Sequence, residues 1–219
     1  FANIARENPF LPEWCSPGHR DCMVGNNSVA VVADAAVKGL VAPADLKVLY
    51  DALVYGSENV HPSVSSSGRL GHEYYNSLGY IPCDVGINES VARTLEYAYN
   101  DWCLLQIAAL LERPQEEKDR WKSRSENWRN VFDASAKLMR GRKKDGNFAE
   151  DFNPYKWGGD FTEGNAWHYT WSVFHDIPGL IEAMGGAAEF EQMLDSVFKA
   201  PPIYDDSYYG YRIHEITEM

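Results

Sequence analysis

Apolar residues near the start of the chain recur at the spacing of one buried helix face. Those within residues 29–40 fall at i, i+3, i+4, i+7, i+8 and i+11, and Gly39 lies near the end of the pattern. The pattern resumes after Pro43 over residues 46–54 and stops at Gly56. It predicts two helices joined by a very short turn, which form an antiparallel pair.

A second pair of helices is predicted after a long segment that has neither helical nor strand periodicity. Residues 60–86 are rich in Ser and Gly, which predicts a long loop, and long ordered loops are usually functional. After Asn88, a candidate N-cap, the apolar positions of residues 91–109 predict a long helix that ends near Pro114. A further amphipathic helix is predicted over residues 115–139.

The second half of the chain alternates between polar loops and shorter helical patterns. Residues 141–155 predict another loop, and helical spacing resumes over residues 167–174. Asp176 is a candidate N-cap for a helix that reaches Met184, and Pro178 fits the first turn of that helix.

One more helix is predicted over residues 190–198, and no run of about four to eight alternating β-branched residues predicts a strand. The predicted fold class is therefore all-α, with paired antiparallel helices as in a toroid or a solenoid. Because no motif repeats at a fixed period, a repeat solenoid is disfavoured. In a toroid the long loops gather at one mouth, where they would share a cavity.

Composition narrows the classes of function. The chain has 219 residues, 45% of them hydrophobic, which is enough for the core of one domain or two. The net charge of -12 disfavours nucleic acid and anionic lipid as partners. No apolar run reaches the roughly 18 residues that span a bilayer, so no membrane partner is expected. The four cysteines form no C-x-x-C pair, and free thiols are favoured over a disulfide such as Cys15 to Cys22.

Glu163 is the most informative ionisable residue, because it stands between Thr162 and Gly164 at the start of an aromatic helical pattern. If Trp167 and Trp171 desolvate its carboxyl, the charged form is disfavoured and the group can donate a proton near neutral pH. The alternative is an ordinary Glu in the first turn of a helix, where the helix dipole lowers its pKa. The residues alone leave both open.

The stretch around Glu163 resembles a known signature. Residues 162–171 (TEGNAWHYTW), followed by residues 175–176 and 179–181, resemble the central motif of glycoside hydrolase family 92, the calcium-dependent exo-acting α-mannosidases. The resemblance covers essentially all of the chain. Its other blocks, in the same order, are LPEW (11–14), CMVG (22–25), VADA (32–35), Lys38-Gly39, GYIP (79–82), VARTLEYA (91–98), Asp101-Trp102, and Arg124, Asn127, Trp128, Asn130, Phe132 and Asp133.

The resemblance implies an architecture larger than this sequence. The family pairs an N-terminal β-sandwich with an (α/α)6 catalytic barrel, and residues 1–219 resemble only the middle of that barrel. We therefore expect part of the barrel, without the sandwich and without the C-terminal part of the barrel, as the start at Phe1 also suggests. Such a fragment would be inactive alone and would self-associate through two exposed apolar edges. These edges contain Val29 and Val32 at one end and Phe190, Leu194 and Phe198 at the other.

The resemblance also assigns site residues. Glu163 corresponds to the general acid that protonates the glycosidic oxygen. Asn165, Trp167 and His168 are expected to line the sugar subsite, although Trp167 could equally belong to the core. Trp14, in a loop next to Pro12, could stack on a pyranose ring or pack under its own loop.

The general base and the metal are expected elsewhere. Inverting hydrolysis needs a second carboxylate roughly 6.5 to 9.5 Å from the acid, and the family's base lies beyond Met219. Asp205 and Asp206 match no base motif, so a solvated turn is expected there. The family uses calcium, whose ligands would lie mostly outside this chain, and no residue here is assigned to the metal.

The function implied by the resemblance is an exo-α-mannosidase that releases mannose from α-mannosides or N-glycans by inverting hydrolysis. Its partners would be mannose-containing glycans, and its location extracellular or periplasmic. Two alternatives remain: a non-catalytic carbohydrate-binding or scaffold remnant, or another helical-toroid enzyme such as a polysaccharide lyase, with Tyr169 as base and His168 as acid.

Overall fold

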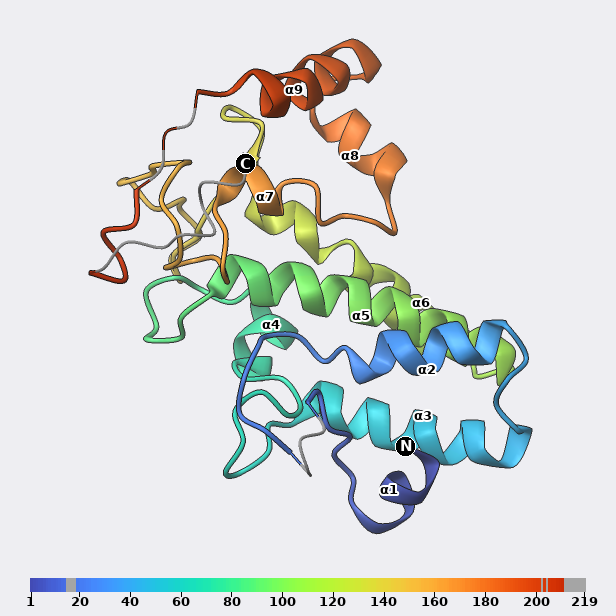
Figure 1. Ribbon diagram of the computed structural model, residues 1–219. Coiled ribbons are helices and arrows are strands. Elements are labelled where there is room, and N and C mark those ends of the chain that lie inside the picture. The colour runs from blue at the N-terminus through green and yellow to red at the C-terminus, as the bar shows by residue number, and fades with distance from the viewer. Residues whose placement is uncertain (15–18, 202, 204, 211–219) are drawn as a thin grey trace. The chain divides into compact units, whose positions relative to one another are not determined.

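The computed structural model describes residues 1–14, 19–201, 203 and 205–210 (Figure 1). The chain folds into two compact units. Unit 1 is formed by residues 1–81 and 93–127, and unit 2 by residues 82–92 together with the chain from residue 128 onward. No helix in the described part of the chain is long and apolar enough to cross a membrane.

Unit 1 is helical. Its helices are α1 (Ala2–Glu7), α2 (Ser28–Val37), α3 (Pro43–Glu58), α4 (His72–Leu78), most of α5 (Ser90–Leu110) and α6 (Gln115–Ser125). Side chains from α2, α3, α5 and α6 share one apolar core, in which Leu53, Leu104 and Trp121 are almost fully buried. Figure 1 shows α2 and α3 side by side and joined by a short turn, which confirms the predicted first pair.

The predicted long loop of residues 60–86 contains a short helix that the sequence reading missed. This helix, α4, lies between Gly71 and Gly79, which both have φ 79°, the left-handed conformation that glycine adopts readily. Its seven residues include only one that is buried, Tyr75, so no apolar periodicity marked it.

The prediction of one helix over residues 115–139 is wrong. Helix α6 ends at Ser125, and a 3-10 turn (Asn127–Val131) leads into a hairpin of β1 (Phe132–Asp133) and antiparallel β2 (Leu138–Met139). The physical reason is local. Oδ1 of Asp133 accepts a hydrogen bond of 2.9 Å from the backbone N–H of Ser135, and Lys137 has φ 55°. A side-chain acceptor for the turn and a left-handed residue both favour a hairpin over a helix.

Unit 2 carries three helices in its described part: α7 (Ala166–Tyr169), α8 (Ile177–Ala183) and α9 (Ala187–Lys199). The helical pattern predicted over residues 167–174 is only one turn long. The N-cap prediction is confirmed, because the Asp176 side chain accepts a hydrogen bond of 3.0 Å from the backbone N–H of Gly179. Pro178 lies in the first turn of α8, as predicted.

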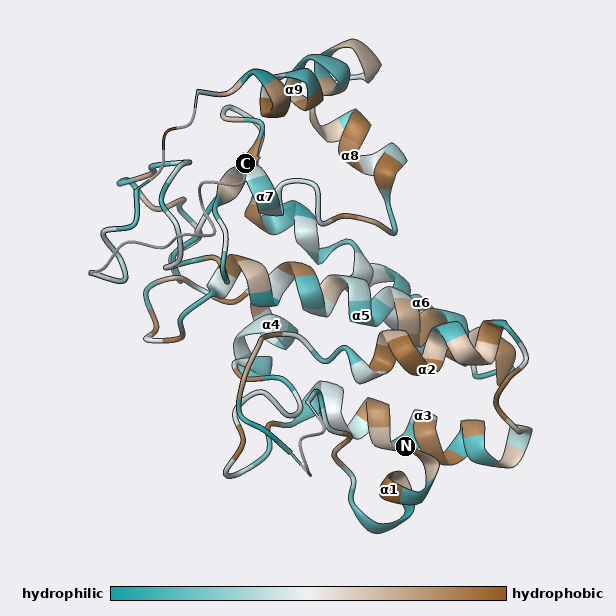
Figure 2. Cartoon of the chain, in the orientation of Figure 1, coloured by the Kyte–Doolittle hydropathy of each residue, from teal (hydrophilic) through white to brown (hydrophobic). Residues whose placement is uncertain are grey.

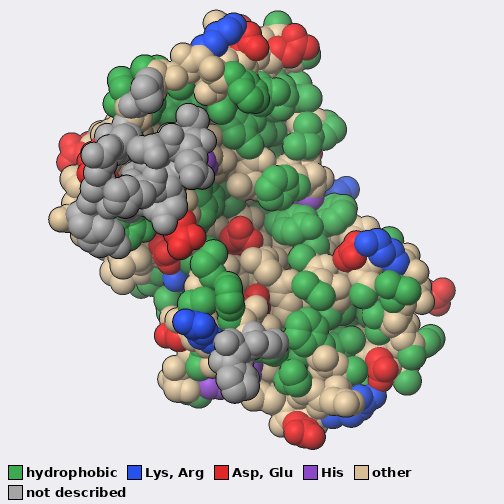
Figure 3. Space-filling model, in the orientation of Figure 1, with side chains coloured by type: hydrophobic (Ala, Val, Ile, Leu, Met, Phe, Trp, Pro, Cys, Tyr) green, Lys and Arg blue, Asp and Glu red, His purple; other side chains and the backbone are tan. Residues whose placement is uncertain are grey.

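Helix α9 is amphipathic, but none of its residues is buried. Figure 2 shows hydrophobic positions along this helix, and Figure 3 shows hydrophobic side chains gathered where α8 and α9 lie. Leu194 is 40% exposed and Phe198 83% exposed, in agreement with the predicted apolar edge. The other predicted edge is wrong. Val29 and Val32 are 0% and 3% exposed, because they belong to the core of unit 1.

Candidate active site

Glu163 lies on a small hydrogen-bonded loop of unit 2. The backbone N–H of Gly158 donates a hydrogen bond of 2.9 Å to the carbonyl oxygen of Gly164 and closes the loop. The hydroxyl of Tyr169 donates a second bond, of 2.7 Å, to the carbonyl oxygen of Thr162. Glu163 has φ 46°, which is uncommon for a residue with a side chain, and its side chain is exposed. The loop therefore presents the carboxyl group outward from a fixed backbone.

The loop ends in a capping box that starts α7. Oδ1 of Asn165 accepts a hydrogen bond of 2.9 Å from the backbone N–H of Trp167, and Nδ1 of His168 accepts one of 3.2 Å from the backbone N–H of Asn165. Glu163 thus precedes the N-cap by two residues, and the first turn of α7 contains no acidic residue. The reading of Glu163 as an ordinary first-turn residue is therefore wrong.

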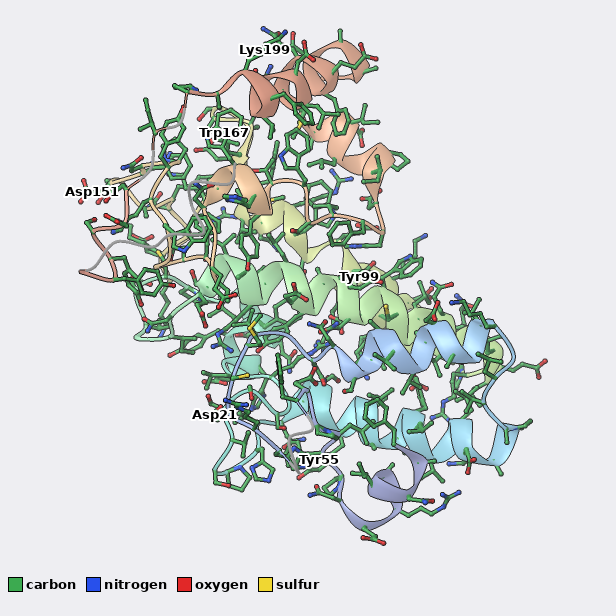
Figure 4. The ribbon with its side chains drawn as sticks, in the orientation of Figure 1. Asp21, Tyr55, Tyr99, Asp151, Trp167 and Lys199 are labelled. Atoms are coloured by element: carbon green, nitrogen blue, oxygen red, sulfur yellow. The ribbon has the colours of Figure 1, made fainter. Side chains whose placement is uncertain are left out.

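The two tryptophans near Glu163 face other aromatic rings. Trp167, which Figure 4 labels, is half-buried against Tyr155, with ring centroids 6.3 Å apart. Trp171 meets Phe190 edge-on, with ring centroids 5.6 Å apart. Glu163 itself is exposed, so the expected desolvation of its carboxyl by tryptophan is absent from this structure.

Asn165 and His168 have structural partners in addition to their predicted subsite role. Asn165 is fully buried, and its Oδ1 caps α7. His168 is half-buried, with its ring edge-on to Trp157 at a centroid distance of 5.2 Å, and burial lowers the pKa of His168. These contacts stabilise the conformation of the segment that follows Glu163.

Asp160 is a half-buried carboxylate that the sequence analysis did not single out. Its carbonyl oxygen accepts hydrogen bonds of 3.0 and 3.1 Å from the N–H groups of Val91 and Ala92 at the start of α5, and its Oδ1 accepts one of 2.9 Å from Ser90 Oγ. A Cβ atom at Gly141 would overlap the carboxylate, so a side chain there would force Asp160 to move. Burial raises the pKa of Asp160. The available signal was a carboxylate directly after two glycines in the same aromatic stretch.

Trp14 belongs to unit 1 and is 47% exposed. Its neighbour Glu13, which the sequence analysis missed, accepts hydrogen bonds of 3.1 and 3.2 Å from the backbone N–H and the hydroxyl of Ser28 at the start of α2. Burial raises the pKa of Glu13 to about 7, and the nearby carboxyl of Glu96 adds to the rise. Glu96 lies on α5, and burial raises its pKa as well.

The structure also describes Asp205 and three of the four cysteines. Asp205 accepts a hydrogen bond of 3.0 Å from Asn153 Nδ2 and precedes a turn, in agreement with the prediction for this segment. Cys22, Cys83 and Cys103 are free thiols, and Cys15 lies outside the described residues. Within the described ranges, no three or more His, Cys, Asp or Glu side chains form a group that could hold a metal ion.

Comparisons with known proteins agree with the sequence signature. Residues 1–216 match the glycosyl hydrolase family 92 catalytic domain. The chain is similar to the solved structure of a family GH92 inverting mannosidase from Bacteroides thetaiotaomicron, with 43% identity and a TM-score of 0.84, over 99% of this chain and 29% of that one. A GH92 α-mannosidase from the same organism, solved in complex with mannoimidazole, has 30% identity and a TM-score of 0.80, over 94% and 28%.

Among curated proteins, the chain is 30% identical over 212 residues to an uncharacterized secreted glycosidase of Arthroderma benhamiae. That match covers 82% of this chain and 27% of the relative. The chain therefore spans less than a third of the length of these relatives. Because the family match runs from residue 1 to residue 216 and includes the loop of Glu163, the chain belongs to glycosyl hydrolase family 92.

Proposed function

We propose that the full-length protein is an exo-acting α-mannosidase that releases mannose from α-mannosides or N-glycans with inversion. The observation that carries this proposal is the position of Glu163. The loop of residues 158–164 presents its side chain outward, within the segment that matches the family signature. The two similar mannosidase structures support the same substrate class.

In the proposed mechanism, the protonated carboxyl of Glu163 donates its proton to the glycosidic oxygen as the C–O bond breaks. A water molecule attacks the anomeric carbon from the opposite face, and a carboxylate base takes a proton from this water. Glu163 leaves the step ionised and must regain a proton before the next turnover. We assign the base to no described residue. Asn165 and His168 act as positioning residues, because their capping box fixes the end of the loop.

Calcium is part of the proposal only as a family expectation. The described residues do not fit a metal site, since they form no cluster of three or more ionisable ligands. We therefore assign no metal ligand in this chain and route no step through the ion. Residues 1–219 alone are expected to be inactive, because an inverting mechanism without its base leaves the attacking water unactivated.

The architecture and location are proposals as well. We propose that residues 1–219 form part of an (α/α)6 barrel, which the similarity over 99% of the chain supports. An extracellular or periplasmic location is supported by the secreted relative.

The stereochemistry of the product tests the proposed reaction. The full-length protein is incubated with methyl α-mannoside or α-mannobiose, and proton NMR follows the first anomer released. An inverting α-mannosidase releases β-mannose first, and the α-anomer then grows by mutarotation. Initial release of α-mannose would contradict inversion, and a lack of hydrolysis of any α-mannoside would contradict the function.

A further inference from the structure

Arg69 is a fully buried arginine of unit 1 that the proposed mechanism does not use. It lies in the loop before α4, where its backbone N–H donates a hydrogen bond of 2.8 Å to the carbonyl oxygen of Asn59. Its own carbonyl oxygen accepts a bond of 3.1 Å from the backbone N–H of His72, at the start of α4. These bonds fix the backbone of Arg69. A charged side chain is seldom fully buried unless its charge and its N–H groups are paired.

The guanidinium group of Arg69 is paired along only part of its edge. Its Nη1 atom donates a hydrogen bond of 2.7 Å to Oδ1 of Asp101, on α5. Its Nε and Nη2 atoms are buried, and no described residue accepts a hydrogen bond from either of them. The N–H groups of Nε and Nη2 point the same way from one edge of the planar group, and such a fork binds anions through two bonds. The fork of Arg69 therefore has room in its bonding for one acceptor.

The aromatic neighbours of Arg69 do not supply this acceptor. The Cζ atom of Arg69 lies 5.7 Å from the ring centroid of Tyr75 and 5.1 Å from that of Tyr97. Both rings attract the cation. Their hydroxyl groups donate to other oxygens: that of Tyr75 to Oδ2 of Asp101 at 3.0 Å, and that of Tyr97 to the carbonyl oxygen of Leu70 at 3.2 Å.

The charges near the fork leave one positive charge in excess. Asp101 also accepts a hydrogen bond of 2.9 Å from Nε of Arg124, so one fully buried carboxylate serves two arginines. Nη1 of Arg124 reaches Glu58 at 2.8 Å, but the same carboxylate oxygen lies 3.7 Å from Nη1 of Arg120. Three guanidinium groups thus share two carboxylates, and one bound monovalent anion would balance them.

Burial and charge together identify the ligand. Because Nε and Nη2 of Arg69 are closed off from solvent, a carboxylate or phosphate group on a larger molecule does not reach them. A water molecule could accept both hydrogen bonds but would leave the excess charge in place. A halide ion accepts the bonds and carries the missing negative charge. We propose that the fork of Arg69 binds a chloride ion.

The chloride ion would have a structural role. It would complete the set of contacts by which the loop before α4 is held to α5, through Asp101, and to α6, through Arg124 (Figure 1). The site is independent of the proposed function, because its residues belong to unit 1 and Glu163 belongs to unit 2.

Anomalous scattering tests the site directly in the wild-type full-length protein. Crystals grown in bromide are measured at the bromine absorption edge, and crystals grown in chloride are measured at long wavelength. We expect an anomalous peak within hydrogen-bond distance of both Nε and Nη2 of Arg69. If neither halide gives a peak at the fork and a water molecule fills it instead, the proposal is wrong.

Thermal unfolding tests the same site in solution. Chloride is replaced stepwise by gluconate at constant pH and ionic strength, so that the screening of surface charges stays the same. A ligand that binds only the folded state shifts the unfolding equilibrium about tenfold for each tenfold rise in its concentration above Kd. We therefore expect the midpoint of unfolding to rise with the logarithm of the chloride concentration. Equal midpoints in chloride and in gluconate would contradict the proposal.

A matched pair of variants locates the effect of chloride. Arg69→Lys keeps the positive charge but removes the fork, so the dependence on chloride should be lost. Arg120→Lys makes the same exchange at a residue of α6 whose side chain is 46% exposed, and it should keep the dependence. The same dependence in both variants would overturn the assignment to Arg69. If Arg69→Lys does not fold, the anomalous measurement on the wild type decides the question.

Discussion

The hydrogen bond from the backbone N–H of Gly158 to the carbonyl oxygen of Gly164, 2.9 Å long, closes the loop that carries Glu163. Residues 158–161 of this loop line a cavity of about 250 Å³. The C-terminal end of the loop leads into α7 through the cap made by Asn165. A change in the cap should therefore reach the position of the proposed acid, which precedes the N-cap by two residues.

The first prediction concerns the role of Glu163. Glu163→Gln in the full-length protein should slow the hydrolysis of α-mannobiose by on the order of 10² to 10⁴, because a poor leaving group needs its proton. Activated aryl mannosides, whose leaving groups need little help, should lose much less. The initial rates of hydrolysis of α-mannobiose and of an activated aryl mannoside test this prediction. Glu191→Gln, which changes an exposed residue of α9, is the control, and equal losses on both substrates would exclude the role of acid.

The second prediction concerns the capping box. Asn165→Ala should lower the free energy of unfolding by about 0.5 to 2 kcal/mol, because it removes the acceptor for the backbone N–H of Trp167. It should also reduce hydrolysis, since the loop of Glu163 loses its anchor. Asn165→Ser keeps a capping oxygen and should recover part of both properties. Denaturant unfolding and initial rates test this, and full activity of the Ala variant would contradict a positioning role.

The third prediction concerns the pH dependence of stability. The pKa of Glu13 is raised from an ordinary value of 4.5 to about 7 in the folded state. Between these values the folded state binds more protons than the unfolded state, so the contribution of Glu13 lowers stability as pH rises. The change is at most about 3 kcal/mol between about pH 4.5 and 7.

Glu13→Gln tests this contribution, because its side chain does not titrate and still offers an oxygen to Ser28. Its stability should fall less than that of the wild type as the pH rises from about 4.5 to 7. Glu7→Gln, at an exposed position of α1, is the control. Parallel profiles of stability against pH for the wild type and Glu13→Gln would contradict this prediction.

The fourth prediction concerns self-association. Residues 1–219 expressed alone should associate at micromolar concentration and bind a hydrophobic dye, because Leu194 and Phe198 of α9 are exposed. Leu194→Gln with Phe198→Gln should weaken both effects. Sedimentation velocity measures the association. A wild-type chain that is monodisperse and binds no dye would contradict the prediction that the apolar face of α9 drives association.

Local sequence patterns determined much of the helical structure. The apolar spacing of residues 29–40 and 46–54 predicted α2 and α3, and the Asp176 and Pro178 pair predicted the start of α8. These features depend on residues within a few turns of each other, so a single sequence carries the signal. The motif around Glu163 is equally local, which is why it identified the family.

Tertiary structure decided the features that depend on distant residues. Arg69 and Asp101 are both fully buried and joined at 2.7 Å, and Arg124 donates to the same carboxylate at 2.9 Å, yet no local pattern links these three positions. The elevated pKa of Glu13 likewise arises from burial and from Glu96 on another element. A side chain's dielectric surroundings and charge partners come from segments far along the chain, so they exist only once the helices have packed.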